Sequence, residues 1–190
     1  TYDDWKDEKL YSCGKAAVNM QVRIASADPI NVPGEIQVKG DNVFLGYFKN
    51  EEATKEVFTD DGWFRTGDMG VLDSDGSLFI KGRTKCMILG PSGQNIYPEE
   101  IETTINSQPY VVDSLVIEDN GGLTALIYPD FAQGVKDGMD QEAFVKYMEG
   151  TLAELNAELP NYAKLKKIEV MSEDFERTPK KSIKRYLYQR

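Results

Sequence analysis

Hydrophobic and polar positions alternate in the first half of the chain with the period of two that is typical of β-strands. Four segments show this pattern: residues 20–25, 35–39, 68–72 and 77–81. Pro33-Gly34 interrupts the chain between the first two, and Ser74-Asp75-Gly76 is a hairpin-turn signal between the last two. A short helix is predicted over residues 51–58. This half is therefore expected to be rich in β-structure.

The pattern changes near Arg83, beyond which helical spacings appear beside further β-rich runs. Pro98-Glu99-Glu100 is a typical helix start, because proline suits the first turn and carboxylates favour the positive end of the helix dipole. One long helix is predicted from Asp140 to Pro160, from the spacing of Phe144, Tyr147, Met148, Leu152, Leu155 and Leu159. Asn120-Gly121 is a second hairpin signal. Strands are predicted over residues 110–117, 123–128 and 165–171.

These elements together predict the α+β fold class, with a boundary near residues 83–86. Residues 1–84 are expected to form a β-rich, distorted barrel-like subdomain. Residues 85–190 are expected to form a small mixed α/β domain, in which helices cover a short sheet. A length of 190 residues with 41% hydrophobic and 28% charged residues suits one large or two small domains with real cores.

Charge is distributed unevenly along the chain. The net charge of −10 argues against binding of nucleic acid or an anionic membrane by the chain as a whole. From Arg177 to Arg190, however, six residues are basic and none is acidic. Two interpretations are open for this segment: a solvated, partly disordered tail, or a segment that binds phosphate groups.

Composition excludes several classes of chemistry. The chain has no histidine, which excludes imidazole catalysis and histidine-containing metal sites within it. Cys13 and Cys86 lack the spacing of a metal or redox motif, which fits a reduced, cytoplasmic compartment. We expect no transmembrane segment and no signal peptide, and leave peripheral membrane association open. Because the first residue is Thr1, we expect a piece of a longer protein.

Two glycine-containing motifs favour simple turns over ligand sites. Asp73-Ser74-Asp75-Gly76 places its glycine too early for an EF-hand loop, and no spaced acidic ligand completes one, so we expect a hairpin turn and no metal site. Gly90-Pro91-Ser92-Gly93 lacks the ending of a phosphate-binding P-loop. We expect it to connect two strands.

The order of four other motifs is more specific than any one of them. Gly62-Trp63-Phe64-Arg65-Thr66-Gly67-Asp68 precedes Gly82-Arg83-Thr84-Lys85, then a Gly93-Gln94-Asn95-Ile96-Tyr97-Pro98-Glu99-Glu100-Ile101-Glu102 run and a basic Thr178-to-Arg185 element. This order resembles the C-terminal part of adenylate-forming acyl-CoA synthetases, over essentially the whole chain. The glycine-rich runs, Gly40 to Tyr47 included, look most like bacterial long-chain fatty acid–CoA ligases.

The resemblance implies roles for four residues. Asp68 would bind the ribose hydroxyls of ATP and the acyl-adenylate, since a carboxylate can accept two hydrogen bonds from a diol. Arg83 would lie near the nucleotide, Lys85 would be the hinge of a mobile C-terminal domain, and Gly93 would present backbone along the CoA channel. The local alternative is that Asp68 caps a turn, Arg83 pairs with a neighbour and Gly93 only turns the chain.

The family's adenylation lysine stands directly before a hydrophobic residue and three residues before an arginine. Ile183 and Arg185 set that frame, which places Ser182 at the lysine position. The neighbouring Lys181, or Lys180 as second choice, is the candidate catalytic cation, because a serine hydroxyl supplies no positive charge. The alternatives are an enzyme that adenylates without this lysine, and lysines that only solvate the tail.

Two family motifs are absent from this sequence: the Ser/Thr/Gly-rich phosphate loop and the Tyr-Gly-x-Thr-Glu motif whose glutamate holds Mg²⁺. We therefore expect a C-terminal fragment that is inactive alone, of an enzyme whose Mg²⁺ is bound outside this chain. The whole enzyme would join a fatty acid to CoA through ATP and an acyl-AMP intermediate. The alternatives are a non-catalytic module that docks a nucleotide or carrier protein, and an adenylation domain that feeds a carrier protein.

Overall fold

A computed structural model describes residues 9–190, apart from the side chain of Gln141. The chain divides into two compact units, Thr1–Cys86 and Met87–Arg190. The sequence pattern places the boundary two residues earlier, between residues 84 and 85. That the first unit belongs to a larger nucleotide-binding domain stays a prediction.

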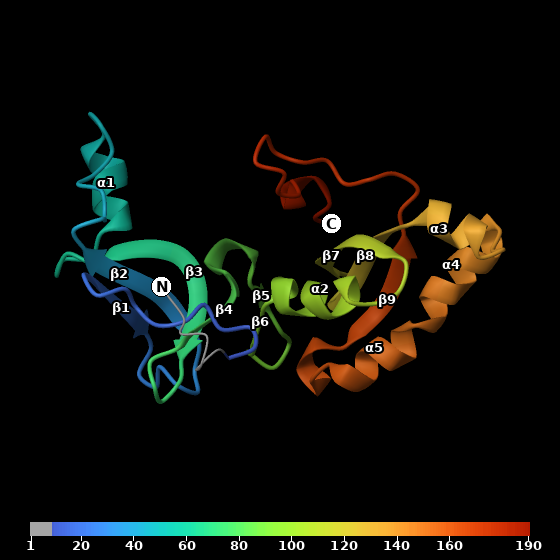
Figure 1. Cartoon of the computed structure of the whole chain (residues 1–190), viewed down its shortest axis with the longest axis horizontal. Helices are drawn as coiled ribbons and strands as arrows, with labels where there is room; N and C mark the ends of the chain where they lie inside the picture. The colour runs from blue at the N-terminus through green and yellow to red at the C-terminus, as the bar shows by residue number, and fades with distance from the viewer. Residues whose placement is uncertain (1–8) are drawn as a thin grey trace. The chain divides into compact units, whose positions relative to one another are not determined.

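The first unit is built on a four-stranded antiparallel sheet (Figure 1). Its strands are β1 (Met20–Ala25), β2 (Gly34–Gly40), β3 (Phe64–Leu72) and β4 (Leu78–Arg83), paired in that order. Within the described residues β1 and β4 do not pair, so the sheet is open and the expected barrel-like closure is wrong. The outer edge of β4 bonds instead to the segment that precedes β1, where the Cys13 N–H donates to the Leu78 carbonyl over 2.8 Å.

Three buried side chains, Ile24, Ile36 and Leu78, form the centre of this unit's core. The predicted helix is α1 (Glu51–Val57), and the Asn50 side chain caps it by accepting a hydrogen bond from the Ala53 N–H over 3.0 Å. A cluster of aromatic rings lies beside this helix: Phe44, Tyr47, Phe58 and Phe64.

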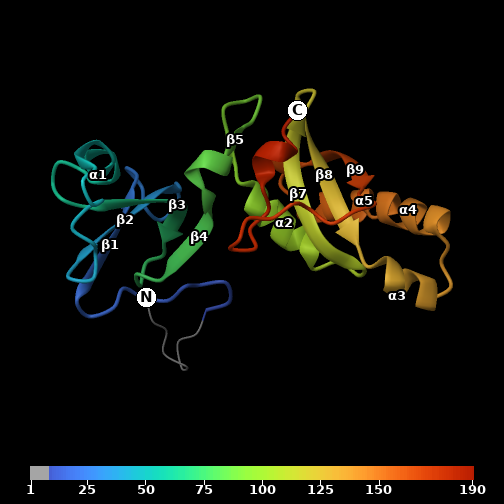
Figure 2. The ribbon, with the colours of Figure 1, turned by 90° about the horizontal axis from the view of Figure 1, so that it is seen from above.

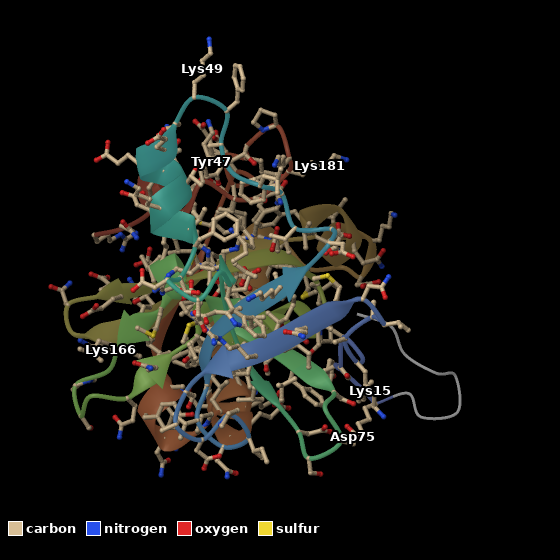
Figure 3. All side chains as sticks on the ribbon, turned by 90° about the vertical axis from the view of Figure 1, so that its left-hand side faces the viewer. Lys15, Tyr47, Lys49, Asp75, Lys166 and Lys181 are labelled. Atoms are coloured by element: carbon tan, nitrogen blue, oxygen red, sulfur yellow. The ribbon has the colours of Figure 1, made fainter. Side chains whose placement is uncertain are left out.

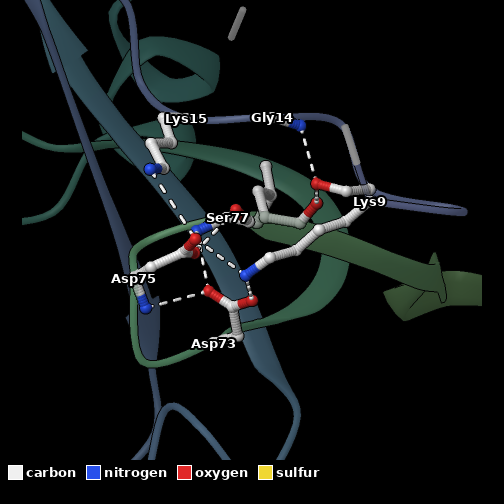
Figure 4. A network of polar contacts seen from close by, with 8 residues as sticks. Lys9, Gly14, Lys15, Asp73, Asp75 and Ser77 are labelled. Atoms are coloured by element: carbon white, nitrogen blue, oxygen red, sulfur yellow. Dashed lines mark hydrogen bonds and ion pairs between the residues drawn. The ribbon is translucent and has the colours of Figure 1, made fainter. Parts of the chain in front are cut away.

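The turn between β3 and β4 is held by side chains, as the hairpin interpretation of this motif requires (Figure 4). Asp73 accepts hydrogen bonds from the backbone N–H groups of Asp75 and Ser77, over 3.1 and 3.0 Å. The Asp75 carboxylate pairs with Lys9 and Lys15 over 2.7 and 3.6 Å. Both carboxylates of the turn are thus engaged by the chain's own donors.

The second unit contains a three-stranded sheet of order β7-β8-β9. Strands β7 (Val111–Asp119) and β8 (Gly122–Pro129) form the predicted hairpin, whose turn residues Asn120 and Gly121 have φ of 49° and 70°. Strand β9 (Leu165–Val170) runs parallel to β8. A small hairpin of β5 (Ile88–Leu89) and β6 (Asn95–Ile96) precedes the sheet, connected by the turn expected at Gly90-Pro91-Ser92-Gly93.

Three helices cover one face of this sheet (Figure 1). Helix α2 (Pro98–Asn106) begins at the predicted proline, and α4 (Gln141–Gly150) and α5 (Leu152–Glu158) follow β8. The prediction of one helix from Asp140 to Pro160 is wrong, because the chain breaks at Thr151. There the hydroxyl donates to the Met148 carbonyl over 2.7 Å, next to the weak helix former Gly150. Helix α3 (Phe131–Lys136), capped by Asp130, was not predicted.

The C-terminal segment covers the opposite face of the same sheet (Figure 2). Leu115, Ile117 and Leu126 point to this face and contact Phe175, which is only 3% exposed. Ile183 and Tyr188 pack against the same cluster. The segment after β9 is therefore an ordered layer of the unit, and the interpretation of a disordered tail is wrong.

Short 3-10 helices occur at η1 (Thr84–Cys86), η2 (Asn161–Ala163) and η3 (Arg185–Leu187). None of the helices found over residues 9–190 is both long enough and apolar enough to cross a membrane.

We expect the two compact units to fold independently of one another, joined by the exposed η1 segment. Lys85 is exposed there, so trypsin should cut after Lys85 and leave two fragments that resist further digestion. Mass spectrometry of a digestion time course measures this. The double variant Arg83→Gln/Lys85→Gln is the control that should delay the first cut, because the exposed Arg83 is a second trypsin site in the same segment. Degradation of the whole chain without such intermediates would contradict separate folding.

Candidate functional site

Thr66, Gly67 and Asp68 form a bulge within strand β3. Arg65 pairs with Gln37 and Met69 with Glu35, so these three residues stand opposite Ile36 alone. The Thr66 hydroxyl donates to the Ile36 carbonyl over 2.7 Å and accepts from the Asp68 N–H over 3.1 Å. Gly67 has φ of 75°, which favours glycine. Bulges of this kind re-aim side chains and are frequent beside active sites.

The bulge brings Asp68 together with Arg83 on the neighbouring strand. These residues are register partners on β3 and β4, and the Arg83 Nε lies 3.0 Å from the Asp68 Oδ1. The Asp68 side chain is 31% exposed and that of Arg83 is 67% exposed. Because the pair faces solvent, the ion pair adds little stability and both groups stay accessible to a ligand.

Lys85 and Gly93 both lie on exposed backbone turns. Lys85 is the central residue of η1, at the end of the first unit. Gly93 belongs to the turn between β5 and β6, with φ of 82°, and its N–H donates to the Gly90 carbonyl over 2.9 Å. Apart from Gly93 and its two chain neighbours, no described residue has a heavy atom within 4 Å of the position that a Cβ on Gly93 would take. Glycine is therefore favoured at this position by backbone conformation and not by crowding.

The C-terminal basic element is a tight hairpin. Arg177 and Ile183 form an antiparallel bridge, and the Lys181 N–H donates to the Thr178 carbonyl over 2.8 Å. Pro179 and Lys180 are the central residues of this turn, and Lys181 follows in the left-handed region with φ of 64°. A turn followed by one left-handed residue is a standard three-residue hairpin connection. Lys180, Lys181 and Ser182 are exposed at its tip. Lys181 is labelled in Figure 3.

Four of the six basic residues of the C-terminal segment pair with carboxylates of the second unit. Lys184 contacts Glu176, and the other three anchor to β7, α2 and β9 through Asp113, Glu102 and Glu169. Among the described residues, Lys180 and Lys181 have no carboxylate partner. The unpaired positive charge of the segment is therefore concentrated at the hairpin tip.

Arg185 anchors the second arm of this hairpin to a buried carboxylate. Glu102 is 8% exposed, and one of its oxygens accepts from the Val116 N–H over 2.7 Å while the other pairs with Arg185. Burial raises the pKa of Glu102 above its ordinary value, although Arg185 and the Val116 N–H act in the opposite direction.

Comparison with known proteins identifies the family. Residues 87–190, more than half of the chain, match the model of the AMP-binding enzyme C-terminal domain. This chain belongs to the AMP-binding enzyme family. Its matched region coincides with the second compact unit, so the hairpin with Lys180 and Lys181 lies in the family's C-terminal domain.

Curated relatives of this chain are named as CoA ligases. Long-chain-fatty-acid–CoA ligase FadD15 of Mycobacterium tuberculosis is 30% identical over 201 residues, which cover 95% of this chain and 32% of the relative. A 2-succinylbenzoate–CoA ligase of Bacillus cytotoxicus is 43% identical over 117 residues, covering 60% of this chain and 24% of the relative. The chain thus spans about a quarter to a third of the length of these relatives.

Solved structures match residues of both units, over 94% of this chain. O-succinylbenzoate coenzyme A synthetase of Bacillus subtilis, in complex with ATP and magnesium ion, has a TM-score of 0.76 and 29% identity over 94% of this chain and 35% of its own. ATP-bound MatB of Rhodopseudomonas palustris has a TM-score of 0.72 and 32% identity over the same shares. The mixed α+β fold expected for this chain is confirmed.

Within each compact unit, the structure brings some of the predicted site residues together. Asp68 and Arg83 are in contact, and Lys180 and Lys181 share one turn with Ser182. The anchoring residues Glu102, Asp113 and Arg177 were missed as a group. The sequence indicated only that a basic segment on a chain of net charge −10 would find carboxylate partners, and not which carboxylates these are.

The described residues contain no group of three or more histidine, cysteine, aspartate or glutamate side chains that could hold a metal ion. That Mg²⁺ is bound by residues outside this chain, as the family resemblance implies, stays a prediction.

Replacing Arg185 with methionine should destabilise the second unit in a pH-dependent way. Removing one partner of a buried ion pair costs about 3–5 kcal/mol, and we expect the lower end because Arg185 is partly exposed. Glu102 would then be buried without its cation, and its pKa would rise further. A carboxyl with a raised folded-state pKa contributes most stability below its unfolded-state pKa, and this contribution is lost as pH rises through the folded-state pKa.

The loss of stability in Arg185→Met should thus be smaller at about pH 5 than at about pH 8. Urea unfolding of the 190-residue chain at both pH values measures it. The double variant Glu102→Gln/Arg185→Met is the control, because it has no carboxyl to titrate at this position. An equal loss at both pH values would contradict this account of Glu102.

Proposed function

We propose that this chain supplies the C-terminal part of an ATP-dependent acid–CoA ligase. The observation that carries the proposal is the hairpin tip, where Lys180 and Lys181 are exposed without a carboxylate partner in the described part of the chain, while the basic residues around them are anchored. Membership of the AMP-binding family and relatives named as CoA ligases support the same function.

The proposed reaction has two steps. A carboxylate oxygen attacks the α-phosphorus of ATP, the bond to the β-phosphate breaks, and pyrophosphate leaves. The thiol sulfur of CoA then attacks the acyl carbon, its proton is lost, and the carbon–oxygen bond to AMP breaks. In the first step two anions must approach one another, so a cation that neutralises them lowers the barrier.

Lys181 is the proposed cation for adenylation, with Lys180 as second choice. A lysine ammonium on a flexible stem at an exposed turn can reach a ligand that approaches the tip. Asp68 is proposed to accept hydrogen bonds from the ribose hydroxyls, with Arg83 beside the nucleotide. The contact between Asp68 and Arg83 supports this proposal, because it holds the carboxylate at the bulge without burying it.

Residues 1–84 are proposed to belong to the nucleotide-binding part of the enzyme and residues 85–190 to be the mobile domain. Lys85 is the proposed hinge, which its exposed position in η1 supports. Gly93 is proposed to line the channel for CoA, supported by its open, left-handed turn. The relatives named as CoA ligases favour CoA over a carrier protein as the acyl acceptor.

A fatty acid is the proposed acyl substrate, since FadD15 aligns with 95% of this chain. The aryl acid 2-succinylbenzoate is the second candidate, because the ligase named for it is 43% identical over a shorter stretch. Assay of the whole enzyme with ATP, CoA and each acid class distinguishes the two. The acid that supports the higher kcat/KM decides the substrate.

The lysine assignment predicts that Lys181→Gly slows adenylation in the whole enzyme. Glycine suits the left-handed backbone at this position, so the turn should keep its shape and the loss reports the side chain alone. Loss of a charge-assisted contact costs about 1.5–3 kcal/mol, which corresponds to roughly 10-fold to 100-fold in rate. Pyrophosphate exchange with ATP measures this step, and thioester formation from supplied acyl-adenylate should be unchanged.

Three further measurements of pyrophosphate exchange test the assignment to Lys181. Lys180→Ala should have the smaller effect if Lys181 is the catalytic cation. Ser182→Lys should leave the rate unchanged in that case, whereas acceleration by Ser182→Lys would mean that the family frame holds and the lysine is missing from this chain. The 190-residue chain alone should give no exchange above background, and turnover by it would overturn the proposed division of roles.

A second prediction concerns Asp68→Asn, which keeps the shape of the side chain and removes its charge. We expect weaker use of ATP by about 1.5–3 kcal/mol in kcat/KM, because a charged acceptor for the ribose is lost. The free energy of unfolding should change little, since the Arg83 pair is largely exposed. Glu35→Gln is the matched control. Glu35 also pairs with an arginine, Arg65 of β3, and its replacement should leave ATP use unchanged. Unfolding without loss of ATP use would assign Asp68 a structural role.

A further inference from the structure

Arg177 connects the hairpin tip to the body of the second unit. The Nη1 nitrogen of its guanidinium donates to the Lys181 carbonyl over 3.3 Å. The Nη2 nitrogen donates to Asp113 of β7 over 2.8 Å and to Asp174 over 2.9 Å. A single planar group thus joins the backbone of the candidate catalytic lysine to a strand of the central sheet.

These contacts limit the orientations that the tip can take. The Asp113 carboxylate also accepts from the Ser114 N–H over 2.9 Å, and Asp174 accepts from the Phe175 N–H over 2.7 Å. Both carboxylates are therefore fixed to backbone independently of Arg177. The Arg177 side chain is 31% exposed and that of Asp113 is 24% exposed, so the contact is only partly screened by water.

The geometry of arginine suits this position better than that of lysine. A guanidinium has five donors in a rigid plane, so it can hold two carboxylates and a carbonyl at once. An ammonium could pair with the acids, but it would not keep the Lys181 carbonyl in a fixed direction. Lys181 has left-handed backbone, its N–H donates to the Thr178 carbonyl, and its own carbonyl accepts from Arg177, so the Arg177 contact is a second hold on the turn.

We propose that Arg177, held by Asp113 and Asp174, is a positioning residue that orients the Lys180–Lys181 tip for the adenylation step. This inference rests on the proposed function of the tip. Arg177 acts through the backbone of Lys181 and not on the substrate. Its loss lets the tip sample several orientations, and a displacement of about 1 Å at a catalytic group can cost roughly 100-fold in rate.

The test compares Arg177→Met and Arg177→Lys with the parent in the whole enzyme. We expect pyrophosphate exchange to fall at least about tenfold in kcat for Arg177→Met, with KM for ATP within about twofold of the parent. Arg177→Lys should recover only part of the rate. Thioester formation from supplied acyl-adenylate should be unchanged in both variants.

Arg190→Met is the matched control. It removes an arginine of the same segment that pairs with Glu169 over 2.8 Å and, within residues 9–190, bonds to neither the tip nor Asp113. Both half-reactions should stay at the parent rate in this variant. Equal losses in Arg190→Met and Arg177→Met would mean that general loosening of the segment, and not the orientation of the tip, sets the rate, and would overturn the inference.

A structural readout is independent of activity. In the 190-residue chain, hydrogen exchange at the Lys181 amide should speed up in Arg177→Met and stay at the parent rate in Arg190→Met.

Failure of the proposed function and failure of this inference give different results in the pyrophosphate assay. If neither Lys181→Gly nor Lys180→Ala slows pyrophosphate exchange, the tip is not catalytic and the inference falls with it. If one of these two variants is slow but Arg177→Met is not, only the inference is overturned.

Discussion

The sheet of the second unit is apolar on both faces, and the rest of that unit follows from this constraint. Val116, Ala125 and Ile127 face the helices, while Leu115, Ile117 and Leu126 face the opposite side. Helices α2, α4 and α5 can cover only one of the two faces. The second face needs another apolar layer, because burial of apolar surface is the main favourable contribution to folding. The segment after β9 supplies that layer and is thereby fixed in place.

Because the C-terminal segment has an ordered conformation, its charged side chains have fixed positions. Phe175, Ile183 and Tyr188 pack against the sheet, and the basic residues between them meet acidic side chains of β7, α2 and β9. Pro179 to Lys181 are the part that turns away from this layer. A segment that reads as a uniformly basic tail is therefore divided into anchoring residues and an exposed tip by packing alone.

Much of the fold was predictable from the sequence because local signals agree with tertiary packing. The alternation in β1 and β2, the Asn120-Gly121 turn and the proline start of α2 all act within a few residues. The break at Thr151 and helix α3 were missed because their local signals, Gly150 beside Thr151 and the Asp130 cap, are weak. The bulge at Thr66-Gly67-Asp68 was not predicted, because its offset against Ile36 depends on the register of a distant strand. The Arg177 and Glu102 contacts join residues 64 and 83 positions apart and have no local signature.

The covering of the sheet by the segment after β9 has a consequence for the synthesis of the chain. Phe175, Ile183 and Tyr188 come after every strand of this sheet in the sequence, so they leave the ribosome after those strands. Until then β7 and β8 can bury one face only, and Leu115, Ile117 and Leu126 stay open to solvent. Nascent chains with such uncovered apolar strands are the ones that chaperones bind and that aggregate when release is slow. The second unit can therefore finish folding only after the residues that hold the lysine-bearing hairpin in place have been synthesised.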